Sequence, residues 1–306
     1  VFEAKLMSHG PSIFPGSLKP LWKAMVSLGY SLLGLRLFVA SIISVFSGTL
    51  AIALIYKLTE RLFGKWSGVY AAATCASMLS FIHFSRWSQP QMTSMSLVLA
   101  AIVLYRPWSF SPHLKRVALF AAGIFSGITL FYYPGYVTGC MILIAWTIMD
   151  AVCGGRRWSK NRVRDSGLDP LVLLAGISAA VLTPELIIRV ARHVGFPSAA
   201  SWVGSIWLEW GWHLGSGVPS VVSKPDYFHY WRVLSSWDGS SYLAAVVLCS
   251  IFMGVEMARH QSSRMFRGFS ILWLPLAFVT AWPAIRAGGM DKYIVLFLPG
   301  VPIVLG

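Results

Sequence analysis

Leu37–Tyr56 reads LFVASIISVFSGTLAIALIY, a run of twenty residues without one Asp, Glu, Lys or Arg. As a helix, such a segment is long enough to cross the hydrocarbon core of a bilayer, which takes about 20 residues. Seven further segments of the chain also lack Asp, Glu, Lys and Arg: Ser67–Phe84, Pro90–Tyr105, Val117–Met149, Pro170–Pro184, Gly239–Val255, Gly268–Ile285 and Tyr293–Gly306. The longest of them, Val117–Met149, is divided in two by Tyr132–Tyr136, which reads YYPGY. The sequence therefore predicts an all-α fold, a polytopic transmembrane helical bundle of about nine spans.

The basic residues between these segments predict the orientation of the bundle. Alternate loops hold 14 of the 25 lysines and arginines in four short clusters: Lys57, Arg61, Lys65; Arg106, Lys115, Arg116; Arg156, Arg157, Lys160, Arg162, Arg164; and Arg259, Arg264, Arg267. Short loops rich in Lys and Arg stay in the cytoplasm, so the four clusters are expected on the cytoplasmic side. Residues 1–36 then form an extracytoplasmic first loop with an interfacial helix. Residues 37–306 form the transmembrane domain, with a long Trp-rich outer loop near 187–239.

The composition agrees with a membrane protein. The chain is 56% hydrophobic and only 12% charged, against about 25% charged in soluble domains. Cytoplasmic loops facing anionic lipid headgroups explain the net charge of +14, so nucleic acid is not an expected partner. The four cysteines lie in or at the ends of apolar segments without a CxxC motif, and they are interpreted as core residues. No cofactor is required by any motif; a divalent metal remains an alternative, although no metal site is indicated.

The ends of the chain suggest a longer protein. The sequence begins with Val1 and stops at Gly306 inside an apolar run. We therefore expect further segments at both ends.

A series of short elements carries a family resemblance. Their order is Glu3-Ala4, Lys19-Pro20-Leu21, Arg36, Tyr56…Arg61-Leu62-Phe63-Gly64, an Ala-rich helix over Ala71–Ala76, Ser85-Arg86 and, near the end, Lys292-Tyr293…Leu298-Pro299…Pro302. In order and spacing they resemble membrane glycosyltransferases of the GT-C architecture, of the protein O-mannosyltransferase and lipid A aminoarabinose transferase type. The match is good over about residues 1–105 and weak beyond. The resemblance implies a sugar donor carried on a polyprenyl phosphate and an active face outside the cytoplasm.

The resemblance also implies a catalytic carboxylate in the first outer loop. The family's catalytic aspartate falls at Phe2 here, and Glu3 is the best remaining carboxylate. In that role Glu3 acts as general base, taking a proton from the acceptor as it attacks the anomeric carbon of the sugar. The alternatives are that Glu3 is a solvated loop acid, or that the chain is a catalytically lapsed relative.

A lipid-linked phosphate needs donors that remain charged at the membrane surface. The arginine guanidinium can bind a phosphate through two parallel hydrogen bonds. Arg86 and Lys292 match the family pattern, and Lys19 is expected to lie near Arg86. These are the candidate donor-phosphate residues. The alternative is that they extend toward lipid headgroups, which explains most interfacial Arg and Lys residues.

The long outer loop contains the run WLEWGWH, with Trp207, Trp210 and Trp212. Indole rings stack on sugars, so these residues are candidates for sugar or acceptor binding. The favoured interpretation is an interfacial aromatic belt, because the amphipathic indole ring suits the headgroup region. Asp150, at an inner helix end, is interpreted as a carboxylate solvated at the interface.

Together these features predict a membrane glycosyltransferase that moves a sugar from a polyprenyl-phosphate donor to an acceptor on the extracytoplasmic face. The expected location is the bacterial inner membrane, with the bilayer and the polyprenyl-phosphate-linked sugar as partners and other membrane subunits as further candidates. The rival hypothesis is a non-catalytic GT-C-like subunit or scaffold of a larger membrane complex.

Overall fold

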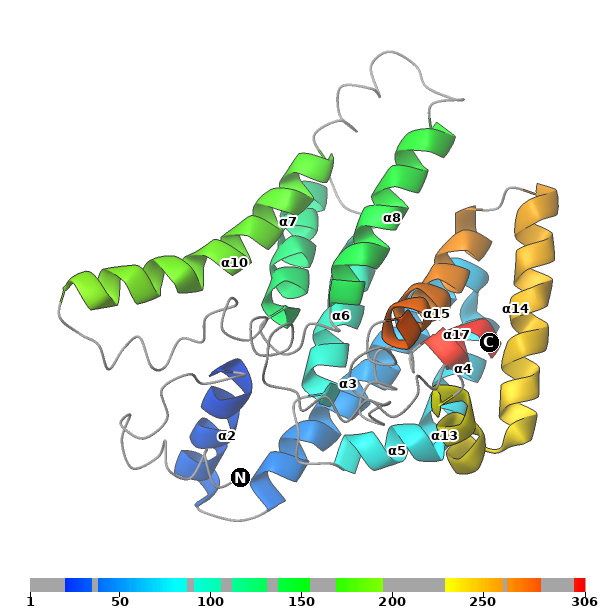
Figure 1. Ribbon diagram of the computed structural model, residues 1–306, viewed down its shortest axis with the longest axis horizontal. Helices are drawn as coiled ribbons and strands as arrows, with labels where there is room; N and C mark the ends of the chain where they lie inside the picture. Colours follow the sequence, from blue (N-terminus) through cyan, green and yellow to red (C-terminus); the bar gives the residue numbers. More distant parts are fainter. Residues whose placement is uncertain are drawn as a thin grey trace.

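The computed structural model describes residues 20–34, 38–86, 91–105, 112–130, 137–154, 169–194, 229–260, 263–281 and 300–305. In these ranges all regular structure is helical and no strand occurs, which confirms the all-α prediction there (Figure 1). The helices are α2 (Pro20–Leu33), α3 (Phe38–Phe63), α4 (Lys65–Ser77), α5 (Leu79–Arg86), α6 (Gln91–Tyr105), α7 (Pro112–Thr129), α8 (Val137–Gly154), α10 (Asp169–His193), α13 (His229–Asp238), α14 (Ser240–His260), α15 (Ser263–Ala281) and α17 (Gly300–Leu305).

Helix α3 lies at the centre of the packing and contacts α2, α4, α5, α6, α15 and α17. Its buried residues recur every three or four positions, which places them on one stripe of the helix. They are Val39, Ala40, Ser44, Ser47, Gly48, Ala51, Ile55, Leu58, Thr59 and Leu62. Small residues dominate the first half of this stripe, and small side chains let membrane helices approach closely. Gly64, with φ +109°, then lets the chain turn directly into α4, a conformation that favours glycine.

Contacts between helix ends show that the helices flanking the four basic loops bring those ends together at one end of the bundle, the fourth through the pair of Arg267 on α15 with Asp150 on α8. Arg61, near the end of α3, donates a 2.7 Å hydrogen bond to the carbonyl of Val103, near the end of α6. Lys115 on α7 pairs with Asp169, the first residue of α10. We call this the basic end; it is uppermost in Figure 1, whereas α2, α5 and α13 lie at the opposite end. The clustering expected from the sequence is confirmed for the helix ends that flank these loops.

Helices α7 and α10 pack through glycines. A Cβ atom added at Gly123 would lie 2.4 Å from the carbonyl oxygen of Leu173, and one added at Gly176 would lie 2.3 Å from that of Phe120. Gly127 makes a similar approach to Ile177. The two backbones therefore meet without intervening side chains, as in small-xxx-small pairs of membrane helices.

Fewer spans are shown than the sequence predicts. Three helical segments of the described ranges are long and apolar enough to cross a bilayer: Phe38–Phe63, Asp169–Ile187 and Ser240–Arg259. A fourth results if α4 and α5, bent by 64° at their junction, count as one broken span. The predicted division of Val117–Met149 is confirmed, since α7 ends at Thr129 and α8 begins at Val137. Helix α6 and the apolar part of α8 are shorter than a full span.

Candidate functional site

Helix α5 presents Arg86 at the end of the bundle opposite the basic loops. Phe81 and Phe84, 2% and 1% exposed, anchor this two-turn helix in the core. The hydroxyl of Ser85 donates to the carbonyl of Phe81 at 2.8 Å, and Ser85 packs so closely on Gly48 of α3 that an added Cβ would lie 2.4 Å from its oxygen. Arg86 itself is exposed in the last turn. An exposed cation is thus carried on a backbone that buried contacts hold in place.

A buried polar seam joins α3 to the start of α6. The hydroxyls of Ser47 and Thr93 lie 2.9 Å apart, and Ser96 donates to the carbonyl of Ser47 at 2.6 Å. Gln91, the first residue of α6, is 4% exposed. These bonds fix the start of α6 against α3, beside the helix that carries Arg86.

Helix α13, the final part of the segment predicted as a long outer loop, packs against α5. The carboxylate of Asp238 accepts two hydrogen bonds from Ser80, one from the backbone N–H at 3.0 Å and one from the hydroxyl at 2.5 Å. The ring of Trp237 lies 4.9 Å from that of His83 and 5.6 Å from that of Phe84, measured between centroids. Because Asp238 is engaged with α5, this carboxylate holds structure together and is not a candidate for the general base.

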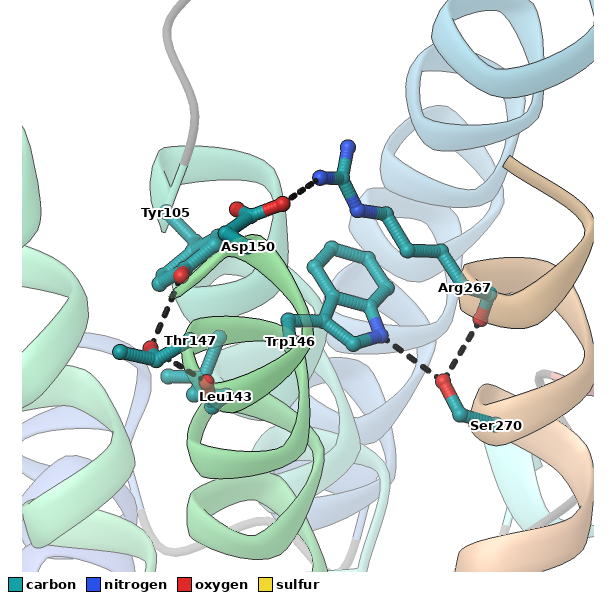
Figure 2. Close-up of polar contacts among 7 residues, drawn as sticks. All are labelled: Tyr105, Leu143, Trp146, Thr147, Asp150, Arg267 and Ser270. Carbon is teal, nitrogen blue, oxygen red and sulfur yellow. Dashed lines mark hydrogen bonds and ion pairs between the residues drawn. The ribbon is translucent and has the colours of Figure 1, made fainter. Parts of the chain in front are cut away.

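A second cluster of polar contacts joins α8 to α15 at the basic end, and Figure 2 shows it. Arg267, 2% exposed, donates to the carboxylate of Asp150 at 2.5 Å, and its guanidinium carbon lies 5.4 Å from the centre of a Trp146 ring. The indole N–H of Trp146 donates to Ser270 at 2.8 Å. Asp150, expected to be simply solvated at the interface, is thus half-buried in an ion pair. Its role here is to join two helices.

A buried phenol lies on α2, beside the first half of α3. Tyr30 is 4% exposed, and its hydroxyl has no hydrogen-bond partner among the described residues. Burial raises the pKa of Tyr30, because the phenolate is the form that loses hydration. The phenol is therefore neutral at physiological pH.

Of the residues predicted for the site, only Arg86 lies in the described ranges. Glu3, Lys19, Lys292 and the tryptophans Trp207, Trp210 and Trp212 lie outside them, so their convergence on Arg86 stays a prediction. The described residues contain no group of three or more His, Cys, Asp or Glu side chains that could hold a metal ion.

Two contacts between helices could not be predicted from the sequence. Asp238 and Ser80 are 158 positions apart, and Asp150 and Arg267 are 117 apart. No motif or helical period links residues at such separations. The available signal is only that each aspartate lies at the end of an apolar segment, where solvation is the simpler explanation.

Solved structures of membrane enzymes share this fold. ArnT from Cupriavidus metallidurans in the apo state is similar with a TM-score of 0.68 and 14% identity, over 99% of this chain and 52% of that one. The same protein bound to undecaprenyl phosphate gives a TM-score of 0.63 and 15% identity, over 94% and 48%. Archaeal oligosaccharyltransferase AglB from Archaeoglobus fulgidus, in complex with an inhibitory peptide and a dolichol-phosphate, gives 0.60 and 13%, over 94% and 41%. This chain spans about half the length of those proteins or less.

Sequence comparison defines the family. No curated protein sequence matches the chain significantly. The sequence profile of the dolichyl-phosphate-mannose-protein mannosyltransferases matches residues 15–188, more than half of the 306 residues. With its GT-C fold, the chain belongs to the dolichyl-phosphate-mannose-protein mannosyltransferase family of integral membrane glycosyltransferases.

Proposed function

We propose that this chain is the membrane part of a glycosyltransferase that takes a sugar from a polyprenyl-phosphate carrier and passes it to an acceptor on the extracytoplasmic face. The observation that carries the proposal is the position of Arg86, exposed at the end of α5 and opposite the four basic loops. The family match and the lipid phosphates bound by ArnT and AglB support the choice of donor.

The proposed reaction needs a base on the acceptor side and cations on the donor side. Glu3 takes the proton from an acceptor hydroxyl or amine, whose oxygen or nitrogen forms a new bond to the anomeric carbon. The bond from that carbon to the phosphate oxygen breaks, and the polyprenyl phosphate leaves with the electron pair. Arg86, with Lys292 and Lys19, holds the negative charge of the phosphate. The acceptor is proposed to lie against Trp207, Trp210 and Trp212, and no metal is part of the proposal.

Orientation follows from the basic end. Since loops rich in Lys and Arg remain in the cytoplasm, α2, α5 and α13 would face the outside of a bacterial inner membrane. The apolar segments that form short helices or lie outside the described ranges would complete about nine spans.

One observation favours a second candidate function. Phe2 stands where the family has its catalytic aspartate, which is what a non-catalytic subunit of a larger membrane complex would show. Such a subunit could still bind the lipid carrier, so donor binding and sugar transfer have to be measured separately.

The test uses the full chain in lipid nanodiscs. Binding of undecaprenyl phosphate is measured directly, and turnover is measured as release of undecaprenyl phosphate from its sugar-linked form. Loss of a charge-assisted hydrogen bond costs about 1.5–3 kcal/mol. Arg86→Ala should therefore weaken lipid-phosphate binding about tenfold to a hundredfold. The affinity of Arg86→Lys should lie between those of the wild type and Arg86→Ala. Arg189→Ala, at an exposed arginine of α10, is the matched control and should bind as the wild type does.

Glu3→Gln distinguishes the two candidate functions. If the chain is an enzyme with Glu3 as base, this change abolishes turnover and leaves lipid-phosphate binding intact. If the wild-type protein binds undecaprenyl phosphate but shows no turnover, the non-catalytic subunit is favoured. Unchanged binding in Arg86→Ala would remove the donor site from α5.

A further inference from the structure

Helix α5 receives its N-terminal cap from a distant part of the chain. Met78, the residue before the helix, has an extended backbone and an apolar side chain that cannot accept the free N–H groups of the first turn. The carboxylate of Asp238, at the end of α13, accepts the Ser80 N–H instead, together with the Ser80 hydroxyl. A carboxylate at this position also interacts favourably with the helix dipole.

The contact continues along one face of α5. Ser80, His83 and Phe84 are spaced three and four residues apart, so they lie on the same side of the helix. The first contacts Asp238, and the other two contact Trp237. Figure 1 shows the two short helices side by side at the end opposite the basic loops.

A helix as short as α5 cannot hold its own conformation. Isolated helices under about 12 residues are marginal in water, so packing has to fix the direction of an eight-residue helix. Ser80 is fully buried, and without Asp238 its hydroxyl and N–H would lose the acceptor they now have. Arg86 lies six residues further on, about 9 Å along the axis, so a change in the direction of α5 displaces its guanidinium.

We propose that Asp238 is a positioning residue for the donor site: by capping α5 from α13 it completes the contacts of Phe81, Phe84 and Ser85 that direct the helix, and thereby places Arg86 against the lipid phosphate. This inference rests on the proposed function, since it needs Arg86 to bind that phosphate. Asp238 itself touches neither donor nor acceptor in this account; it acts through Ser80 and the backbone of α5.

The experiment measures undecaprenyl phosphate affinity and thermal unfolding for variants of the full chain in nanodiscs. Asp238→Ala removes both contacts and should weaken affinity about tenfold. Asp238→Asn can keep both as neutral hydrogen bonds, accepting the N–H and donating to the Ser80 oxygen, so its loss should be about threefold or less. Ser236→Ala is the matched control, because this exposed α13 hydroxyl bonds only to its own helix, and its affinity should equal that of the wild type.

A double variant separates positioning from stability. If Asp238 acts through Arg86, adding Asp238→Ala to Arg86→Ala weakens affinity no further than Arg86→Ala alone. A lower unfolding temperature in Asp238→Ala and Asp238→Asn with wild-type affinity in both would overturn the inference and leave the donor site standing. Additive losses would also overturn it. Wild-type affinity in Arg86→Ala would instead show that the proposed donor site has failed, and the inference with it.

Discussion

The ion pair between Asp150 and Arg267 yields a prediction about stability that has its own internal control. Asp150→Asn removes the negative charge that now pairs with the guanidinium of Arg267, whose side chain is 3% exposed. Removing one partner of a buried pair costs about 3–5 kcal/mol. Asp150 is 27% exposed, and Arg267 would keep its contact with the Trp146 ring. We therefore expect Asp150→Asn to lower the free energy of unfolding by less than this range, about 2–3 kcal/mol.

Asp169 provides the comparison, because it is 24% exposed and so nearly matches Asp150, while its partner Lys115 is 39% exposed. Exposed pairs contribute about 0–1 kcal/mol. In thermal unfolding in nanodiscs, Asp150→Asn should lower Tm by about 4–8 °C and Asp169→Asn by no more than about 2 °C. Salt at about 1 M should abolish the smaller effect and spare the larger one. Equal shifts in the two variants would refute the argument that burial of the arginine sets the cost.

Two further predictions follow from packing and burial. Gly123→Ala should destabilise the bundle by about 1–3 kcal/mol, because its methyl group meets the Leu173 carbonyl, whereas Gly254→Ala, with open space around it, should be neutral or slightly stabilising in the same unfolding assay. Tyr30→Phe should be neutral or stabilising by up to about 1 kcal/mol at pH 7, since the buried hydroxyl it removes has no partner among the described residues. Because burial raises the pKa of Tyr30, the fold keeps its stability below the unfolded pKa of 10.0 and loses it as pH rises from there through the folded pKa, where the unfolded chain ionises first. Tyr30→Phe should therefore reduce the alkaline loss of stability, and a destabilised variant at pH 7 would contradict the assignment.

Charge and hydropathy predict how the helices of this protein are arranged better than they predict where each helix begins and ends. The positions of Lys and Arg predict that four loops share one end, and the bonds that Arg61 donates to Val103 and Arg267 donates to Asp150 place the flanking helix ends together. This succeeds because the position of a charge relative to a membrane depends on the local sequence. Of the candidate site, the family resemblance identifies Arg86 but cannot show what supports it.

The break at Met78 shows why the remainder could not be predicted. Ser67–Phe84 is uncharged throughout and predicts one span, yet it forms two helices that meet at 64°. No proline or glycine marks the bend. The groups that hold it, Asp238 and Trp237, come from a helix about 150 residues later, so neither composition nor periodicity in the segment contains the information.

The two ends of the bundle are therefore stabilised in different ways, and this bears on function. At the basic end, ion pairs and the Trp146 hydrogen bond join the ends of long helices. At the opposite end, the described structure includes the short helices α5 and α13, which are joined to each other by a few side chains. Elements that adjust to a ligand come from the less stable parts of a protein. Substitutions at Asp150 should consequently lower stability without changing lipid-phosphate affinity, whereas Asp238→Ala should lower both stability and affinity, because it leaves the buried Ser80 donors without their acceptor.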